Sequence, residues 1–272
     1  MRVPARVAIL AMLPVLVWTA VAAQETREVF QGPAAEEFLL RARFTRIVDI
    51  NIGVTAPQKV TLQRDGVTRM ALFKTIDVQK TGATPLADGT FEVAFQDSWR
   101  TEVAAYEVDK TIGLGMVPAT VRRTIRSKDG SLQWWVESMM PEAQRVRESV
   151  RPPDAEAWNN VMYKMRLFDR LIYNTDRHLN NVLVTSDFDL RLIDHSRSFR
   201  PFDEVQTFDG LTKFSRSLLE GMTRLEFADL KKRLGRYLSD RQIRALLARR
   251  DQILAHVAER VAAEGEAAVL YD

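Results

Sequence analysis

Three polar residues in the second half of the chain have the types and spacing that phosphoryl transfer requires. Asp176 follows a helical segment, Asn181 lies five residues later, and Asp194 ends a second apolar run. Mg²⁺ binds one or two protein oxygens together with phosphate oxygens and water, so an amide and a carboxylate on adjacent strands can hold it against a nucleotide. A carboxylate at Asp176 can accept the proton of an attacking hydroxyl. Together the three residues predict a site for a nucleotide and a divalent metal.

Two apolar runs predict the strands that position the metal ligands. Val182–Thr185 and Leu190–Ile193 are separated by the four residues Ser186–Asp189, which have turn character. If the hairpin is symmetric about that turn, residues whose numbers sum to 375 face each other, and Asn181 pairs with Asp194. The alternative is a polar loop before an ordinary β-hairpin, because Asp and Asn are common turn and cap residues.

The residues around this site resemble several atypical kinases. Asp176-Arg177-His178-x-x-Asn181 resembles the catalytic loop of phosphatidylinositol 3- and 4-kinases, and Asn174–Leu179 resembles that of HipA-type serine kinases. Leu192-Ile193-Asp194-His195 resembles the metal-binding I-D-F-G motif, with His195 in place of Phe and Ser196 in place of Gly. Secretory-pathway kinases are similar in these features and also around Glu102–Asp109 and the following Val117-Pro118.

The resemblance implies an α+β protein-kinase-like fold of two lobes, a small β-rich N-lobe and a larger helical C-lobe. It implies ATP and Mg²⁺ or Mn²⁺, with Asn181 and Asp194 as metal ligands. It places Asp176, Arg177 and His178 in the catalytic loop, and we expect His178 and His195 to order the loops by hydrogen bonding. The acceptor is a hydroxyl on a protein, a lipid or a sugar, since these relatives modify all three.

Lys74 is the candidate for binding the nucleotide phosphates. A kinase uses a strand lysine for the phosphates and a helix glutamate to orient it. Lys74 alternates with apolar neighbours, and a buried ammonium needs an anionic partner, for which Glu102 is the natural choice. Lys59 could replace Lys74, and Glu107 could replace Glu102. The alternative for Lys74 is an edge-strand lysine whose ammonium reaches solvent.

Three further nucleotide-binding candidates rest on weaker patterns. Gly53 and Thr55 lie between the first two expected strands, where a backbone N–H and a hydroxyl could meet a phosphate. The segment has one glycine where ordinary protein kinases have G-x-G-x-x-G, so a plain β-turn is an equal alternative. Glu137 falls where a hinge would hold adenine through backbone groups.

Strand-like and helical patterns predict the elements that carry these residues. In the first half we expect a short helix at Ala34–Arg41 and a helix at Ser98–Ile112. The expected strands are Phe44–Ile52, Lys59–Gln63, Thr68–Ile76, Met116–Ile125 and Leu132–Met139. Turns are expected at Asp65-Gly66 and Lys128–Gly130, and a loop at Lys80–Gly89.

The second half is expected to be helical outside the hairpin. One helix should begin at Pro152–Asp154 and run to about Tyr173. Capping-box patterns at Thr223–Glu226 and Ser239–Gln242 predict two later helix starts. The expected organisation is a signal peptide (1–23), a linker and short helix (24–43), the N-lobe (44–140) and the C-lobe (141–272).

The first residues predict export. Arg2 and Arg6 precede an apolar run, Val7–Ala23, that ends in small residues, which is typical of a cleaved signal peptide. We therefore expect a periplasmic or secreted protein, with an uncleaved membrane anchor as the alternative. Membrane association is expected only in that second case.

Composition excludes several classes of function. The chain has no cysteine and three histidines among 272 residues, which excludes thiol nucleophiles, thiolate zinc sites and cysteine-ligated iron–sulfur clusters. The net charge of +3 comes from basic residues mixed with acids at helical spacing, so no nucleic-acid partner is expected.

The sequence leaves competing functions open. The first hypothesis is an ATP- and metal-dependent phosphotransferase that acts on a hydroxyl. The second is an exported, catalytically inactive kinase-like binding module, which the single glycine and the departures after Asp194 keep open. A metal-dependent hydrolase is a third, disfavoured because no His–carboxylate metal cluster accompanies the acidic residues.

Overall fold

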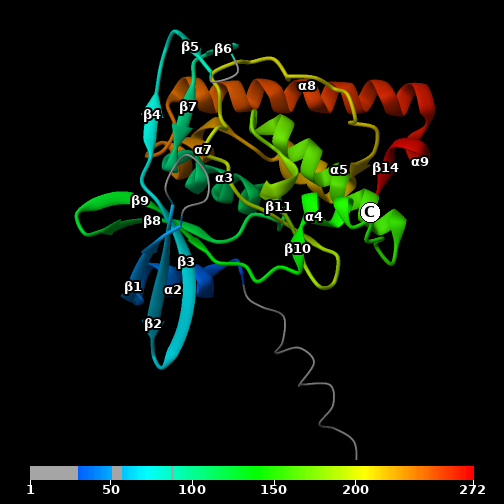
Figure 1. The fold of residues 1–272 in the computed structure, drawn as a ribbon. Coiled ribbons are helices and arrows are strands. Elements are labelled where there is room, and N and C mark those ends of the chain that lie inside the picture. Colours follow the sequence, from blue (N-terminus) through cyan, green and yellow to red (C-terminus); the bar gives the residue numbers. More distant parts are fainter. Residues whose placement is uncertain (1–29, 51–56, 87–88) are drawn as a thin grey trace, which may run out of the picture.

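The N-terminal part of the molecule is an antiparallel five-stranded sheet covered by two helices. The computed structural model describes residues 30–50, 57–86 and 89–272. The strand order is β1-β2-β3-β9-β8. The strands are β1 (Arg43–Asp49), β2 (Gln58–Arg64), β3 (Val67–Lys74), β9 (Lys128–Trp134) and β8 (Thr120–Ile125). In Figure 1 this sheet lies apart from the long C-terminal helix, which crosses the opposite end of the molecule.

Two helices pack on β8 and β9 and on each other. They are α2 (Pro33–Arg41) and α3 (Trp99–Ile112). The hydroxyl of Tyr106 in α3 donates to Glu36 of α2 at 2.7 Å. Ser98 caps α3 by accepting the N–H of Arg100, and Gly113 ends the helix in the left-handed conformation that glycine adopts without strain. Both expected helices of the first half are confirmed.

Of the two turns expected in the sheet, one is at the predicted residues and the other is not. The β2–β3 turn falls at Asp65-Gly66 as expected, with both residues at positive φ. The β8–β9 turn falls at Arg126 and Ser127, also both at positive φ, so the expected turn at Lys128–Gly130 is wrong. Those three residues belong to β9.

The expected loop at Lys80–Gly89 is also wrong in part. Its residues contribute to a small hairpin in which β5 (Ala83–Pro85) pairs with β6 (Phe91–Val93). Below it β4 (Asp77–Gln79) pairs with β7 (Gln96–Ser98). These short strands form a ribbon that leads from β3 to α3, and the ribbon rises beside α8 in Figure 1. The strands have only three residues each, so their pattern is too short to distinguish from a loop by periodicity.

The C-terminal part is helical. Its helices are α4 (Glu142–Arg147), α5 (Ala155–Leu171), α6 (Arg216–Thr223), α7 (Phe227–Leu234), α8 (Asp240–Glu264) and α9 (Glu266–Val269). Asp154 caps α5, and a full capping box of Ser239 and Gln242 starts α8, both as expected. The pattern at Thr223–Glu226 is not a capping box, because Thr223 ends α6 and Glu226 is the N-cap of α7.

Short strands complete the C-terminal part. One sheet of three strands has the order β10 (Met140–Pro141), β11 (Val182–Val184), β12 (Leu190–Leu192). A parallel pair joins β13 (Phe214–Ser215) to β14 (Leu270–Tyr271). A 3₁₀ turn, η1 (Leu179–Asn181), leads into β11. None of the helices in the described ranges is both long enough and apolar enough to span a bilayer.

Buried apolar side chains run continuously from the sheet into the helices. Phe73 and Leu132 of the sheet, Val108 of α3 and Phe168 of α5 are each at most 1% exposed. Complete burial of side chains of this size stabilises the fold by about 2 kcal/mol each. The end of β3, the first turn of α3 and the β11–β12 hairpin are therefore held in fixed positions relative to the core.

Candidate active site

Lys74, the last residue of β3, lies between two carboxylates. Its Nζ is 2.6 Å from Oε1 of Glu102 and 2.7 Å from Oδ1 of Asp194. The side chains of Lys74 and Glu102 are 7% and 2% exposed, so Lys74 does not reach solvent as the edge-strand alternative required. Neither charge could be buried alone without a large cost.

The ammonium of Lys74 is stabilised by both carboxylates and in turn stabilises the charge of Glu102. Burial by itself lowers the pKa of Lys74, but the carboxylates of Glu102 and Asp194 outweigh it and hold the pKa well above its usual range. Burial likewise tends to raise the pKa of Glu102. The ammonium of Lys74, together with the imidazole of His195, whose Nδ1 lies 3.7 Å from Oε2, outweighs that effect and holds the pKa of Glu102 well below its usual range. The ammonium and the helix carboxylate are therefore both charged at neutral pH.

Glu102 also fixes the chain that follows Asp194. Its Oε2 accepts the backbone N–H of His195 at 3.0 Å. One carboxylate in the first turn of α3 therefore holds both the strand lysine and the segment after the hairpin. Lys59 and Glu107, the alternative candidates for the lysine–glutamate pair, contact other residues. Lys59 lies 3.9 Å above the ring of Trp135, and Glu107 pairs with Lys110 at 2.9 Å.

Gly130 of β9 allows β3 to approach at the level of Lys74. A Cβ on Gly130 would lie 2.3 Å from the carbonyl oxygen of Lys74 and 2.7 Å from the ring of Phe73. Both distances are far inside van der Waals contact. The glycine that the sequence suggested as a turn residue is therefore required for close packing beneath the lysine.

The β11–β12 hairpin has a different register from the one expected. Val182 pairs with Leu192 and Val184 with Leu190, so the numbers of paired residues sum to 374 and not to 375. The turn contains three residues, because the N–H of Thr185 donates to Asp189 and the N–H of Phe188, at φ 60°, donates back to Thr185. A left-handed third residue is typical of three-residue hairpin loops.

The direct pairing of Asn181 with Asp194 is therefore wrong by one residue. Asn181 lies opposite Ile193, whose N–H donates to the Asn181 carbonyl at 3.1 Å. Asp194 has left the strand, with φ at 59°. The carboxylate of Asp194 contacts Lys74 from this bent backbone position, outside the paired part of the strand.

Asn181 and Asp194 both keep an oxygen that suits a hard cation. The amide of Asn181 donates from Nδ2 to the backbone of Asp176 at 3.3 Å, so its Oδ1 is left as an acceptor. Oδ1 of Asp194 is used by Lys74 and by the hydroxyl of Ser196 at 3.2 Å. Oδ2 of Asp194 has no donor within the described ranges. An amide oxygen and a carboxylate oxygen match the ligands that Mg²⁺ and Mn²⁺ prefer.

The described residues contain no complete protein cage for a metal. No group of three or more His, Asp or Glu side chains in the described part of the chain is arranged to hold an ion. A site with two protein oxygens fits the way Mg²⁺ is bound beside substrate phosphates.

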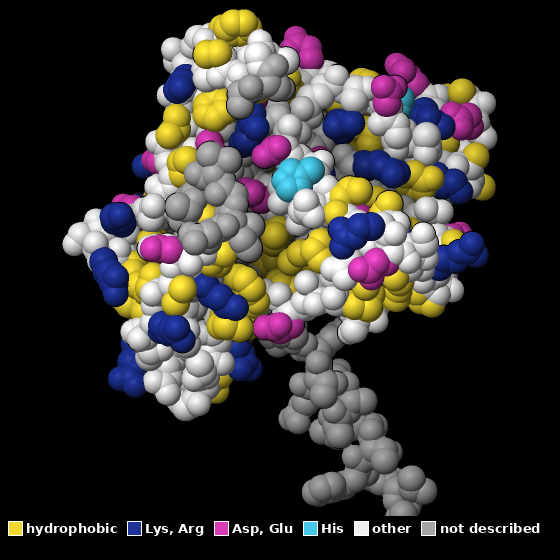
Figure 2. All heavy atoms as spheres, viewed as in Figure 1, with side chains coloured by type: hydrophobic (Ala, Val, Ile, Leu, Met, Phe, Trp, Pro, Cys, Tyr) yellow, Lys and Arg dark blue, Asp and Glu magenta, His cyan; other side chains and the backbone are white. Residues whose placement is uncertain are grey.

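The loop between α5 and β11 presents Asp176 to solvent. Asn174 shapes this loop, since its amide donates to Asp169 at 3.0 Å and its Oδ1 accepts the N–H of Asp176 at 3.0 Å. The carboxylate of Asp176 is 42% exposed, and Nη1 of Arg197 lies 3.9 Å from its Oδ2. Figure 2 shows acidic side chains beside a histidine near the middle of one face of the molecule. Asp176 is accessible to an acceptor.

Arg177 is bound on all sides by the protein itself. Its guanidinium contacts Asp169 at 3.0 Å, the carbonyls of Asn181 and Ile193 at 2.9 and 2.7 Å, and Nε2 of His195 at 2.9 Å. These contacts join the loop to both strands of the hairpin. The structure thus gives Arg177 a positioning role.

The two histidines of the motifs behave differently. His195 is fully buried and contacts Arg177 and Glu102, and burial lowers its pKa. His178 is exposed, and its imidazole makes no hydrogen bond within the described part of the chain. The expectation of a loop-ordering hydrogen bond therefore holds for His195 and is wrong for His178.

The segment that joins β9 to β10 leaves backbone groups unused. The N–H of Met139 donates to Val184 at 2.9 Å and that of Trp135 to Met70 at 3.1 Å. Between them, Val136, Glu137 and Ser138 make no backbone hydrogen bond to another described residue. The side chain of Glu137 is exposed. This connection can offer main-chain donors and acceptors to a ligand.

Gly53 and Thr55 lie outside the described residues, and so does the expected signal peptide. The roles of these residues stay predictions.

Two residues near the site were not marked by any sequence pattern. Oδ1 of Asp97, in β7, is buried without a hydrogen-bond partner, and burial raises the pKa of Asp97. Arg197 contacts Glu92 of β6 and approaches Asp176. Asp97 precedes a helix N-cap, where acidic residues are common for local reasons, so only its spatial position marks it.

The comparisons with known proteins identify the fold. No protein-family model matches the chain, and no curated protein matches it by sequence. The solved structure of the Golgi casein kinase is similar at a TM-score of 0.60 and 15% identity, over 87% of this chain and 78% of that one. The proinflammatory kinase CtkA of Helicobacter pylori is similar at a TM-score of 0.52 and 11% identity, over 84% and 97%. The expected fold, with its β-rich N-terminal and helical C-terminal parts, is confirmed.

Proposed function

We propose that this chain, which has a protein-kinase-like fold, transfers the γ-phosphoryl group of ATP to a hydroxyl group of a protein, lipid or sugar. The observation that carries the proposal is the ammonium of Lys74, which contacts the helix carboxylate of Glu102 and the carboxylate of Asp194. In kinases a strand lysine paired with a helix glutamate binds the nucleotide phosphates.

Each part of the nucleotide has a proposed binding partner. Lys74 binds the α- and β-phosphates, to which Gly53 would offer a backbone N–H and Thr55 a hydroxyl. The free backbone groups of the segment with Glu137 bind the adenine. The oxygens of Asn181 and Asp194 would hold Mg²⁺ or Mn²⁺, which supplies positive charge to the phosphate oxygens when bound.

The transfer step uses Asp176 as the base. Its carboxylate accepts the proton of the acceptor hydroxyl while the hydroxyl oxygen forms a bond to the γ-phosphorus. The bond from that phosphorus to the bridging oxygen breaks, and ADP leaves with the electron pair. Arg177 keeps the loop of Asp176 fixed against the strands that carry Asn181 and Asp194.

Nucleotide binding gives the first test of the proposal. ATP with MnCl₂ or MgCl₂, at about one hundred times its Kd, should stabilise the folded chain by about 2.7 kcal/mol. For a chain of this size that corresponds to a rise in Tm of roughly 5–10 °C. The measurement is thermal unfolding of the full chain with ATP and metal, with ATP and EDTA, and with metal alone.

The control is the same measurement on Asp194→Asn, which should lose the metal-dependent part of the shift. If neither metal produces a shift with ATP, the chain does not bind the nucleotide. The alternative of an exported, catalytically inactive kinase-like binding module would then replace the proposal. Release of free phosphate at the full rate without any acceptor would instead favour a hydrolase.

We also propose that the chain is exported and works outside the cytoplasm. The basic and apolar pattern of residues 1–23 supports this, and one solved neighbour is named for the Golgi. N-terminal sequencing of the protein from a compartment-resolved extract tests it, with a mature start at or near Gln24 expected. A full-length cytoplasmic protein would contradict it.

A further inference from the structure

The segment after Asp194 brings a cation to the exposed side of Asp176. Nη1 of Arg197 lies 3.9 Å from Oδ2 of Asp176, which is too long for a hydrogen bond. The side chain of Arg197 is 23% exposed and that of Asp176 is 42% exposed. Within the described ranges, Nη1 of Arg197 donates no hydrogen bond to another residue. Its N–H groups are therefore free to bind a ligand beside the carboxylate of Asp176.

The positive charge of Arg197 is only partly neutralised by the protein. Nη2 of Arg197 donates to Oε2 of Glu92, in β6, but Oε1 of the same carboxylate accepts a hydrogen bond from Nη2 of Arg200. Arg200 is 1% exposed, and its Nη1 donates to the carbonyl of Ala94. One carboxylate therefore faces two guanidinium groups. Since Arg200 is enclosed, the remaining positive charge is accessible to a ligand at Nη1 of Arg197.

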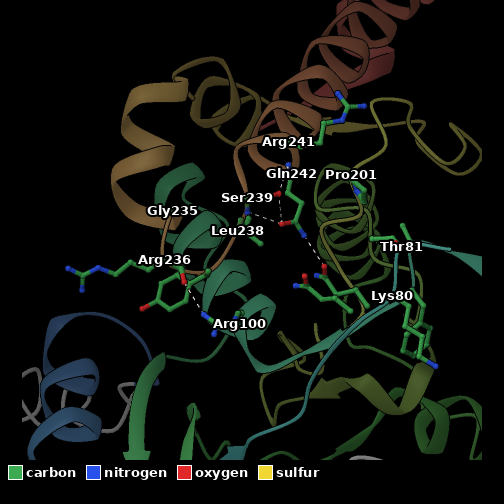
Figure 3. A pocket seen from close by; sticks show the side chains of 15 residues that line it. Lys80, Thr81, Arg100, Pro201, Gly235, Arg236, Leu238, Ser239, Arg241 and Gln242 are labelled. Atoms are coloured by element: carbon green, nitrogen blue, oxygen red, sulfur yellow. Dashed lines mark hydrogen bonds between the residues drawn. The ribbon is translucent and has the colours of Figure 1, made fainter. Parts of the chain in front are cut away.

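The ribbon between β3 and α3 holds Arg197 in this orientation. Besides the carboxylate of β6, the ring of Phe95 lies 5.3 Å from the guanidinium carbon of Arg197, within the range of a cation–π contact. The ribbon is itself fixed, because Gln96 donates to the carbonyl of Ser198 and accepts from Gln242 of α8, both at 2.8 Å. Figure 3 shows the side chain of Gln242 pointing from α8 toward the ribbon. Arg197 is therefore oriented before any ligand binds.

A main-chain contact joins Arg197 to the loop of Asp176. The hydroxyl of Thr175 donates to the backbone carbonyl of Arg197 at 3.1 Å. This contact does not depend on which side chain is present at position 197. Replacing the side chain of Arg197 should therefore leave the loop of Asp176 in place.

Two other cations near Asp176 are already bound. The guanidinium of Arg177 donates to Asp169 and to two backbone carbonyls. The ammonium of Lys74 lies between two carboxylates and is proposed to bind the α- and β-phosphates. Neither cation is left for the γ-phosphoryl group, whereas Nη1 of Arg197 is.

We propose that Arg197 is a further catalytic residue, whose Nη1 donates to the γ-phosphoryl group during its transfer; this inference rests on the proposed function. The acceptor hydroxyl has to meet both the carboxylate of Asp176 and the γ-phosphorus, so the γ-phosphoryl oxygens lie next to that carboxylate. In the transition state the negative charge is spread over these oxygens. A guanidinium that is fixed beforehand stabilises this charge without reorganisation. Arg197 keeps its protons throughout, because a guanidinium is always charged at neutral pH.

Replacing Arg197 with methionine tests its role, with ATP and MgCl₂ as donor and casein as acceptor. The rate of phosphate transfer should fall by a factor of about 10²–10³, the usual effect of losing one preorganised donor. Glu92 keeps Arg200 as its partner, so no carboxylate is left without a cation and the Tm should stay close to that of the unaltered chain. The ATP-induced thermal shift should also be kept.

A second measurement does not depend on turnover. ADP with MgCl₂ and aluminium fluoride, a flat anion that mimics the phosphoryl group in transfer, should raise the Tm of the unaltered chain more than ADP with MgCl₂ alone. Arg197→Met should lose this additional rise and keep the effect of ADP. The matched control is Arg241→Met, which removes an exposed arginine paired with Asp203 at 3.0 Å. It should keep both the rate and the additional rise.

The outcomes distinguish the role of Arg197 from the proposed function. If the unaltered chain transfers no phosphate and shows no thermal shift with ATP and metal, the proposed function fails and the role of Arg197 fails with it. If the unaltered chain transfers phosphate, and Arg197→Met is faster or within about threefold of Arg241→Met, only the role of Arg197 is overturned. Arg197→Lys keeps a cation and should transfer faster than Arg197→Met. Equal rates in these two variants would contradict a role of the charge.

Discussion

Replacing Asp176 with asparagine is expected to reduce phosphoryl transfer by a factor of about 10²–10⁴, the usual effect of losing a general base. Asparagine has the same size but cannot accept the proton of the attacking hydroxyl. The side chain is 42% exposed and its charged neighbour Arg197 is 3.9 Å away, so the stability and the ATP-induced thermal shift should be unchanged. The measurement is incorporation of labelled phosphate from ATP into the chain itself and into casein.

A matched control for this variant is Asp209→Asn, the same chemical change at another exposed loop position. It should transfer phosphate at the rate of the unaltered chain. If Asp176→Asn keeps its rate within about threefold of that control, Asp176 is not the base, since general-base catalysis is worth far more.

Replacing Lys74 with methionine is expected to abolish transfer and also to destabilise the fold. The variant leaves the carboxylate of Glu102, 2% exposed, without its cation. Breaking a buried ion pair in this way costs about 3–5 kcal/mol. Urea unfolding measures the loss of stability, and the phosphate-incorporation assay measures the loss of activity.

A second substitution separates these two effects. Glu102→Gln in the Lys74→Met background removes the unpaired charge but keeps an acceptor for the N–H of His195. It should recover much of the stability and none of the activity. Lys59→Met, a lysine of the neighbouring strand that stacks on Trp135, is the control and should retain activity. Recovery of activity in the double variant would contradict the role of Lys74.

The pH dependence of this difference follows from the direction of the pKa of Glu102. In the unaltered chain that pKa lies below its usual value, so the stability it contributes is present above the ordinary pKa of glutamate and is lost as the pH falls. In Lys74→Met burial acts without the lysine and raises the pKa of Glu102, so protonation relieves the penalty at acid pH. The difference in the free energy of unfolding between the unaltered chain and Lys74→Met should therefore be largest near pH 8 and should become smaller toward pH 5.

Local patterns were enough to predict α2, α3, α5, the start of α8 and most of the sheet. The periodicity around Ser98–Ile112, the turn at Asp65-Gly66 and the cap at Ser239 involve neighbours in the chain, and the structure has all three. The spacing of Asp176, Asn181 and Asp194 also predicted that these three residues belong to one site. A loop followed directly by a hairpin keeps them within a short stretch of the chain.

Predictions from local patterns were wrong where packing between distant segments determines the position of a turn or the register of a strand. Gly130 reads as a turn residue, but its missing side chain is needed against Lys74, 56 positions away in the chain. The register of the β11–β12 hairpin depended on whether its turn contains three or four residues. A register shift of one residue places every side chain of a strand on the other face. His178 and His195 each follow an aspartate of the site by one or two residues, so the sequence does not distinguish them. Only the tertiary structure shows that His178 is exposed and His195 is buried.

The sequence by itself therefore predicted the chemical groups of the site: Asp176 in the loop after a helix, an amide and a carboxylate near one hairpin, and a strand lysine in need of an anion. Only the tertiary structure decided that Lys74 lies 2.6 and 2.7 Å from Glu102 and Asp194, and that Arg177 donates to the carbonyls of Asn181 and Ile193. The physical reason is that a buried charge selects its partner by distance in the folded core, where desolvation makes any other arrangement too costly.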